Sequence, residues 1–270
     1  DAQMGQMARE INFPETTFIT GGSPETGFDV RIFTPEYEVP FAGHPTLGTA
    51  WVLTNQLLKF PGTSVTLNLK IGPIRVETLG DTLWLTAAQP HFGQTFSPAH
   101  VAELLHIPEN AIDEDYPIEW VSTGLPDVIV PLRALEGIRA VRLEAESCKN
   151  WLLRHHLHRT NSLDQLTTSF YVFCPETYSP ANHLNARMFC LENSAITEDP
   201  ATGSAASCLL AYLLKNKFGG QASIRLRVEQ GYERHRPSLL ELDGTIRPDG
   251  KYTLRIGGQV QFVARGEWTV

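Results

Sequence analysis

The sequence contains two copies of one local pattern: an acidic residue and a proline, then small residues with a glycine, then an apolar segment. In the second copy, Asp199 and Pro200 precede small residues at 201–207, and apolar residues continue to Leu214. Because this segment is apolar nearly all round, it predicts a helix buried on most sides. The N–H groups and positive dipole end of such a helix favour an anion such as a carboxylate. On spacing alone, the favoured interpretation of Asp199 is an N-cap.

The first copy lies 160 positions earlier, counted from Gly203 back to Gly43. Here Glu38 and Pro40 come before the small residues, and a helix is predicted over 46–58. Two helix starts of one design indicate two similar halves that face each other across a cleft. That two Gly/Pro-rich helix starts are alike by chance stays open as the alternative.

Composition narrows the class of protein. At 270 residues the chain is long enough for one large domain or two ordinary ones, and 42% hydrophobic with 19% charged residues is typical of a globular protein. A net charge of −8 argues against nucleic acid or an anionic membrane as the main partner. No apolar run reaches membrane-spanning length, and no signal peptide opens the chain. The cysteines are widely spaced, which argues against zinc or a redox pair and predicts a reduced, cytoplasmic setting.

Periodicity and turn signals predict alternating strands around the two central helices. A helix is predicted at 1–11, a second at 98–105, partial helix at 134–149, and a strand–turn–strand at 120–132. The further predicted strands are 16–20, 30–33, 64–70, 74–79, 82–87, 169–174, 185–190, 223–230, 238–243, 252–257 and 260–266.

Three histidines lie close together at His155, His156 and His158. Such a cluster raises the question of a metal site, but Arg154 and Arg159 would repel a cation and no matching ligands are evident. The sequence therefore predicts a solvated surface here and no metal.

Three titratable residues stand beside these backbone signals: Glu15 after Pro14, His44 after Gly43, and Asp199. A proton shift needs a base and an acid, and a carboxyl group such as Glu15 suits both when burial raises its pKa. The dipole of a helix start disfavours charged His44, which leaves a neutral hydrogen-bond partner or proton relay. Singly, each is as consistent with a surface group, a core hydrogen bond or a cap.

Other reaction classes fit worse. The sequence has no G-x-S-x-G elbow, no H-E-x-x-H, no Walker loop and no dinucleotide fingerprint. Ser204 in TGSAA has no triad signature around it, although with Asp199 it is placed to orient a substrate amine, carboxylate or hydroxyl group. A hydrolase is therefore disfavoured.

The sequence resembles the PhzF family of isomerase-like proteins of phenazine biosynthesis. The matching motifs run along nearly the whole chain: ETTF at 15–18, RIFTPEYEVPFAGHPTLGTA at 31–50, STGLPDVIVPL at 122–132, RMF at 187–189, EDPATGSAAS at 198–207 and EQGYERHRPS at 229–238. The resemblance implies an α+β fold like that of diaminopimelate epimerase. Two similar barrel-like β-sheet domains would each wrap around a central helix, with the active site in the cleft between them.

The predicted domains are 1–118 and 119–257, and a C-terminal strand near 258–270 is expected to complete the first. Members of the family usually begin with a strand and a Gly-Asn-Pro-type turn upstream of the helix that opens this sequence. The expectation is that this part is missing, which would leave the first barrel with an open edge.

The resemblance also implies roles for individual residues. It makes Glu15 the general base and acid, and it places His44 and Asp199 in the same site. The expected substrate-binding residues are Gly43, Gly203 and Ser204. The cysteine pair of diaminopimelate epimerases is absent, and the aligned positions are Ala42 and Ala201, which leaves a proton shift driven by a carboxylate, without a cofactor.

We therefore expect a cofactor-independent isomerase of a small carboxylate-bearing metabolite, cyclic or amino-acid-like, in a homodimer. The alternative is a non-catalytic small-molecule-binding protein that retains the fold. A structural or partner-binding protein is a third hypothesis, and it would show a large exposed apolar patch.

Overall fold

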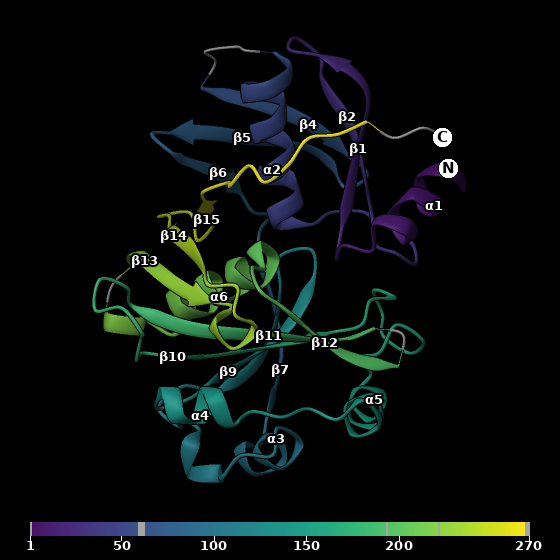
Figure 1. Ribbon diagram of the computed structural model, residues 1–270. Coiled ribbons are helices and arrows are strands. Elements are labelled where there is room, and N and C mark those ends of the chain that lie inside the picture. The colour runs from purple at the N-terminus through teal and green to yellow at the C-terminus, as the bar shows by residue number, and fades with distance from the viewer. Residues whose placement is uncertain (1, 59–62, 193, 221, 268–270) are drawn as a thin grey trace.

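The computed structural model describes residues 2–58, 63–192, 194–220 and 222–267. Its strands form two repeats of one pattern (Figure 1). In the first repeat an antiparallel hairpin is followed by a short strand that pairs back onto it, a central helix, and an antiparallel meander. Its strands are β1 Thr16–Ser23, β2 Gly27–Phe33, β3 Glu38–Val39, β4 Ser64–Leu69, β5 Gly72–Leu79 and β6 Thr82–Thr86.

The second repeat uses the same pairings in the same order. Its hairpin strand pairs in parallel with the first strand of the meander, as β2 pairs with β4 in the first repeat. The short strand again pairs back onto the hairpin. Its strands are β10 Ser169–Cys174, β11 Leu184–Glu192, β12 Ala195–Asp199, β13 Ser223–Gln230, β14 Ser238–Ile246 and β15 Tyr252–Gly258.

Each repeat surrounds one helix, α2 (Gly43–Val52) in the first and α6 (Gly203–Lys215) in the second (Figure 1). Every residue of α6 from Gly203 to Leu214 is buried, as its nearly uninterrupted apolar character predicts. The helix predicted over 46–58 differs in detail. It begins at Gly43, and residues Leu53–Leu57 continue as a π-helical turn in which Leu58 N–H bonds Leu53 O at 2.8 Å.

Strands β9 (Pro126–Pro131), β8 (Ile118–Ser122) and β7 (His91–Phe96) extend the sheet of the second repeat beyond β10. Helices α3 (Pro98–Leu104), α4 (Leu135–Ala140) and α5 (Ala145–Arg154) form an outer layer on one face of this sheet. Along β9 the side chains alternate: Val128 and Val130 pack with this outer layer, whereas Ile129 packs with the core around α6. β7 and α3, which precede residue 118, pair with β8 and pack in the same outer cluster as the second repeat. The predicted domain boundary at 118 stays a prediction.

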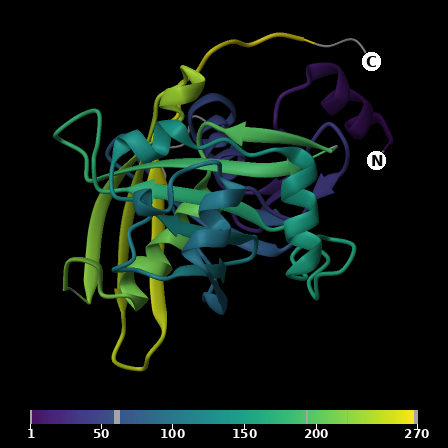
Figure 2. The ribbon, with the colours of Figure 1, turned by 90° about the horizontal axis from the view of Figure 1, so that it is seen from below.

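The two repeats join edge to edge. β15 pairs with β14 on one side and with β6 on the other, so that the sheet order runs β1-β2-β4-β5-β6-β15-β14-β13-β11-β10-β9-β8-β7. Figure 2 shows β13, β14 and β15 side by side at one edge of the molecule. One core cluster contains Leu85 and Ile256 from the two sides of the junction as well as α6. The repeats are therefore parts of one hydrophobic core.

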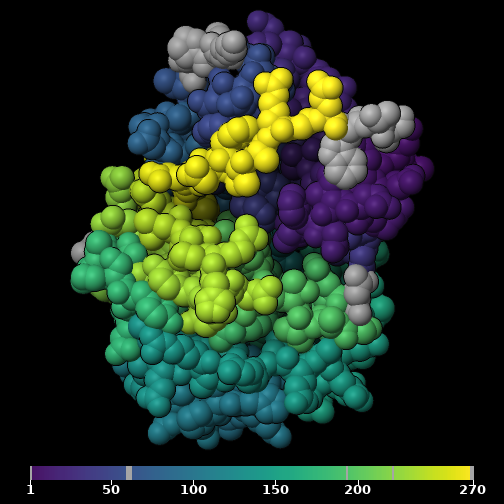
Figure 3. All heavy atoms as spheres, in the orientation of Figure 1, coloured from purple at the N-terminus to yellow at the C-terminus, as the bar shows by residue number. Residues whose placement is uncertain are grey.

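The strand predicted over 260–266 is wrong. Residues 259–267 form no strand but an extended segment that crosses the first repeat (Figures 1 and 3). Phe262 stacks on Trp51 of α2 with ring centroids 5.8 Å apart, so the segment contacts the half that it was expected to complete. Helix α1 (Ala2–Ile11) lies where the sequence predicts it. Among the described residues, none of the helices has both the length and the apolar character needed to cross a membrane.

Candidate active site

The two central helices meet at their N-terminal ends. A Cβ atom added to Gly43 would lie 2.8 Å from the Cα of Gly203, and one added to Gly203 would lie 3.2 Å from the Cα of Gly43. Only glycine permits this approach of backbone to backbone. The N-cap residues of the two helices are Ala42 and Thr202, each directly before one of these glycines.

A cavity of about 620 Å³ lies at this meeting point, between the repeats. Its lining comes from both repeats, from β9, and from α5 and the segment that follows it. All six residues predicted for the site line it: Glu15, Gly43, His44, Asp199, Gly203 and Ser204. The structure therefore brings together residues that the sequence separates by as much as 189 positions (Glu15 to Ser204).

Glu15 stands directly before β1 and faces His44 in the first turn of α2. Its Oε2 atom lies 3.3 Å from His44 Nε2, and this oxygen is buried without a hydrogen bond. Burial, with smaller contributions from the negative charges of Asp199 and Glu192, raises the pKa of Glu15 to about 8. At neutral pH this carboxyl group therefore mostly carries its proton.

The pKa of His44 is shifted in the opposite direction, below its usual value. Burial is the main effect that lowers its pKa, and the positive charge of Arg236 acts in the same direction. The charge of Asp199 and a backbone hydrogen bond with Ala201 oppose this shift without overcoming it. The site therefore pairs a carboxyl group that holds its proton with an imidazole that is neutral at neutral pH.

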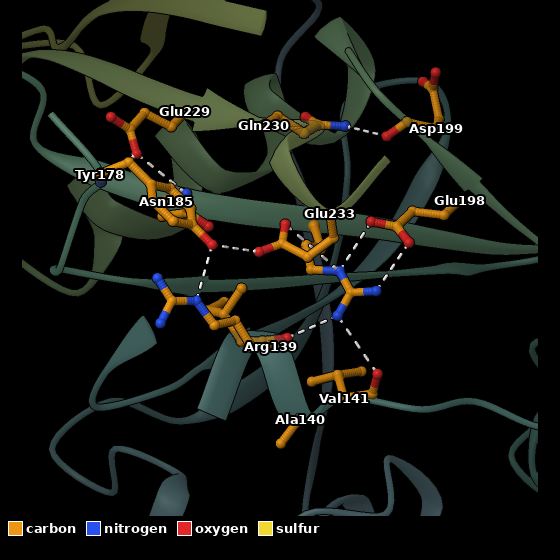
Figure 4. A network of polar contacts seen from close by, with 12 residues as sticks. Arg139, Ala140, Val141, Tyr178, Asn185, Glu198, Asp199, Glu229, Gln230 and Glu233 are labelled. Carbon is orange, nitrogen blue, oxygen red and sulfur yellow. Dashed lines mark hydrogen bonds and ion pairs between the residues drawn. The ribbon is translucent and has the colours of Figure 1, made fainter. Parts of the chain in front are cut away.

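Asp199 ends β12 and is fixed from several sides. Its Oδ2 accepts a hydrogen bond from the Thr202 hydroxyl at 2.5 Å, and Oδ1 accepts one from Ala201 N–H at 3.4 Å. Its backbone carbonyl accepts the Gln230 amide at 2.7 Å (Figure 4). Because Thr202 occupies the N-cap position, the interpretation of Asp199 as the N-cap of α6 is wrong.

Matched ion pairs fix the acidic residue before each helix start. Arg31 bonds both carboxylate oxygens of Glu38 at 2.9 and 3.0 Å, and Arg187 bonds both of Glu198 at 2.8 and 2.9 Å (Figure 4). Each arginine also lies over a phenylalanine two positions on, Phe33 or Phe189.

The strand pairings give the equivalent positions of the two repeats. Glu38 pairs with Phe33 as Glu198 pairs with Phe189, so the repeat relates Val39 to Asp199. The chemically active groups are therefore not duplicated. By the same register, His44 corresponds to Ser204, and Glu15 corresponds to Ser169 in β10.

The prediction of a solvated histidine cluster is wrong for two of its members. His158 is buried, bonds the Thr160 hydroxyl through Nδ1 at 2.8 Å and lines the cavity. His155 is half-buried against the rings of Trp151 and Phe96, and only His156 is exposed. In the described part of the chain, no group of three or more metal-ligating side chains is arranged to hold a metal ion.

Sequence reasoning missed several residues that line the cavity, above all Asp127 in β9. The signal was present: a single carboxylate in the otherwise apolar run LPDVIVPL marks a charged group in a buried strand. Other missed lining residues are Lys149, Arg159, Ser169, Cys190 and Glu192, none of which belongs to a recognisable local pattern.

Two repeats, each around a central helix, with a cavity between them where the helix starts meet, define a class: two-lobed proteins of the diaminopimelate epimerase-like fold. Comparison with known proteins specifies the family. Residues 1–266 match the family model PhzC-PhzF, described as phenazine biosynthesis-like protein, and the chain belongs to this family.

Relatives of this chain that are named as isomerases support the assignment to this family. The chain is 32% identical over 277 residues to an uncharacterized isomerase of Pasteurella multocida, covering 99% of this chain and 83% of that protein. It is 31% identical over 273 residues to trans-2,3-dihydro-3-hydroxyanthranilate isomerase of Pseudomonas fluorescens, covering 98% and 87%. The protein is therefore an isomerase of the PhzF family.

Solved structures support the fold. A PhzF-family phenazine biosynthesis protein of Bacillus anthracis superposes with a TM-score of 0.81 at 26% identity, covering 96% of this chain and 86% of that one. A predicted epimerase of Pseudomonas aeruginosa gives 0.75 at 30% identity, covering 100% and 89%. The predicted family and α+β fold are confirmed, whereas the roles of the six site residues and the cytoplasmic location stay predictions.

Proposed function

We propose that the protein catalyses a cofactor-independent proton shift on a small carboxylate-bearing metabolite, with Glu15 as general base and acid. The observation that carries this proposal is the buried Glu15 carboxyl group, 3.3 Å from His44 and with a pKa raised to about 8. A group that titrates close to neutral pH has both forms populated, which suits it to take up a proton and return it.

The two helix starts provide a place for the substrate carboxylate. Gly43 and Gly203 let the backbone approach a ligand, and the first-turn N–H groups have no acceptor within their own helices. Two positive dipole ends at one point favour an anion. Ser204, in the first turn of α6, lines the same part of the cavity.

The reaction needs no co-reactant. The ionised Glu15 carboxylate takes a proton from a carbon atom, and the electron pair of that C–H bond moves into the adjoining conjugated system. Protonated Glu15 then returns the proton to a different carbon, so the formula of the substrate is unchanged. Neutral His44 orients the carboxyl group, and Asp199 orients the polar groups of the substrate.

The names of two relatives suggest the kind of substrate. The proteins of Pseudomonas fluorescens and Pseudomonas chlororaphis are named trans-2,3-dihydro-3-hydroxyanthranilate isomerase, and they are 31% and 30% identical to this chain. We extend from them to a cyclic carboxylate as the substrate class. A homodimer is proposed from the family resemblance alone, and light scattering on the purified protein tests it.

The test is proton NMR in deuterated buffer. Candidate compounds include dihydro-hydroxyanthranilate, cyclic hydroxy acids and amino acids. We expect deuterium to enter one compound with the wild-type protein and the rate to fall by about a thousandfold or more in Glu15→Gln, because the amide accepts no proton. Circular dichroism checks that the variant is folded. Exchange at the wild-type rate in Glu15→Gln would exclude Glu15 as the base.

A further inference from the structure

Asp127 is a carboxyl group that the reaction proposed above does not use. It lies in β9 with 2% of its surface exposed, and it contributes to the cavity lining together with Leu125 and Pro126. The alternation along β9 puts Asp127 on the face of Ile129, toward the core around α6, rather than on the face of Val128. Its side chain is therefore directed to the inner end of the cavity, near the start of α6.

No cation neutralises this group. Within the described part of the chain, Asp127 forms no ion pair and accepts no N–H hydrogen bond; its contact is the Cys208 thiol, a weak donor. Burial raises the pKa of Asp127 to about 7. A buried carboxyl group without a strong donor is costly for the fold, so a ligand donor at this position would remove an unfavourable feature.

The repeat places Asp127 across the cavity from Glu15. Ser169 of β10 is the position equivalent to Glu15, and Asp127 is the direct partner of Ser169 in the parallel β9–β10 ladder. Burial is the main effect that raises the pKa of Cys190, another lining residue, and the negative charges of Glu15 and Asp127 both contribute to this shift. The cavity thus has a carboxyl group on each side of the meeting helix starts.

The charges of the cavity indicate what Asp127 binds. Among the described lining residues, six are carboxylic acids, whereas the permanent cations are Lys149 and Arg159, which are both exposed. Glu198 is already bound by Arg187, and Asp199 by Thr202 and Ala201. Besides Glu15, which the proposed reaction uses, Asp127 is the buried carboxyl group of the described lining residues that lacks a strong donor.

We propose that Asp127 is a specificity-determining residue that binds a protonated amino group of the substrate, while the helix starts at Gly43 and Gly203 hold its carboxylate. This inference rests on the proposed function and adds to it the residue that recognises an amino group of the substrate. The amino group lies on the side of the substrate remote from Glu15, so that the C–H bond faces Glu15.

Ligand binding tests this assignment without the natural substrate. The probes are trans-2-aminocyclohexane-1-carboxylate and cyclohexanecarboxylate, which differ in the amino group, titrated calorimetrically at about pH 8, where an alkyl ammonium is charged. We expect wild-type protein to bind the amino compound about tenfold or more tightly than the other. In Asp127→Asn this preference disappears, while the affinity for cyclohexanecarboxylate stays within about twofold.

Control variants separate Asp127 from general charge and from catalysis. Glu36→Gln removes another, exposed carboxyl group of the cavity and should retain the preference. Glu15→Gln should also retain it, although it stops deuterium exchange. Asp127→Ala repeats the test should the asparagine variant fail to fold.

The inference is overturned if wild-type protein binds both probes equally or neither of them, if Asp127→Asn keeps the preference, or if Glu36→Gln loses it as well. A failure of the proposed function would be visible separately, as exchange that does not depend on Glu15.

Discussion

The Glu15 carboxyl group, which the proposed reaction uses, destabilises the folded protein when it is ionised. In the unfolded chain its carboxyl group releases its proton near pH 4.5, whereas in the folded protein it holds the proton to about pH 8. Between these values the unfolded state binds fewer protons than the folded state, so this group lowers stability progressively as the pH rises. The loss is complete above the folded pKa.

Glu15→Gln should therefore stabilise the protein at high pH. Glutamine resembles the protonated carboxyl group, so we expect a melting temperature on the order of 5 °C above wild type at about pH 8.5 and little difference at about pH 5. Scanning calorimetry at both pH values measures this. An equal difference at both would show that the effect does not come from titration of Glu15.

The individual site residues differ in how far they could be predicted from the sequence. Glu15, His44 and Asp199 stand out because each adjoins a proline or glycine of a family motif. Asp127 also follows a proline of such a motif, Pro126, but its role depends on which strand lies beside β10, a long-range pairing that no local pattern encodes. The shifted pKa values likewise depend on burial, which exists only in the folded chain.

At the scale of elements, the meeting of α2 and α6 determines the site. The contact between Gly43 and Gly203 is one of backbone with backbone, which cannot yield as a flexible side chain can. The helices are therefore held end to end at a separation that admits no further carbon atom.

Gly43→Ala should consequently be damaging, and α2 offers its own control. We expect Gly43→Ala to cost about 1–3 kcal/mol of stability and most of the activity, since it pushes the helix starts apart. Gly48→Ala, at a position of the same helix where a Cβ meets nothing within 4 Å, should gain about 0.5–1 kcal/mol.

Urea unfolding and the exchange assay measure the two effects. Equal stability of both variants would mean that the helix starts can separate at little cost.

Elements with strong periodicity are those that the sequence predicts best. Helices α1 and α3 and strands β4, β6, β10, β13 and β15 lie within a residue or two of their predicted bounds. Strands β7 and β12 were not predicted, because HFGQTF and AITED lack clean alternation and are stabilised by their neighbours β8 and β11. The π-helical end of α2 likewise has no signal in its composition.

At the scale of the whole molecule, the β6–β15 ladder links the repeats. Ile256 of β15 is 1% exposed and pairs with Leu85 of β6 on one side and Leu242 of β14 on the other. Its side chain belongs to the core cluster shared by both repeats. A destabilising substitution at this junction should therefore lower the free energy of unfolding of the entire protein.

Ile256→Ala tests this cooperativity. We expect a loss of about 2–5 kcal/mol, hence a melting temperature lower by about 5–15 °C, in one transition with equal calorimetric and van't Hoff enthalpies. Two separate transitions in the variant would indicate that the repeats unfold independently.

The two-fold architecture could be inferred from the sequence because both helix starts retain an acid, a proline and a glycine. The way the halves join could not. The junction depends on pairing between 82–86 and 252–258, which are far apart in the sequence and contain no matching signal. The extended path of residues 259–267 is decided by packing on α2, as at Trp51 and Phe262, rather than by strand propensity.

The β6–β15 ladder also determines how this chain can be divided. A fragment that ends between the repeats contains β6 but lacks β15, so it presents an unpaired edge strand that is prone to aggregate. The complementary fragment carries the missing strand and the segment that packs on Trp51. Two such fragments, each of which lacks part of the shared core when it is alone, are suited to reassemble in trans. Restored isomerase activity would then report that two attached proteins have come together.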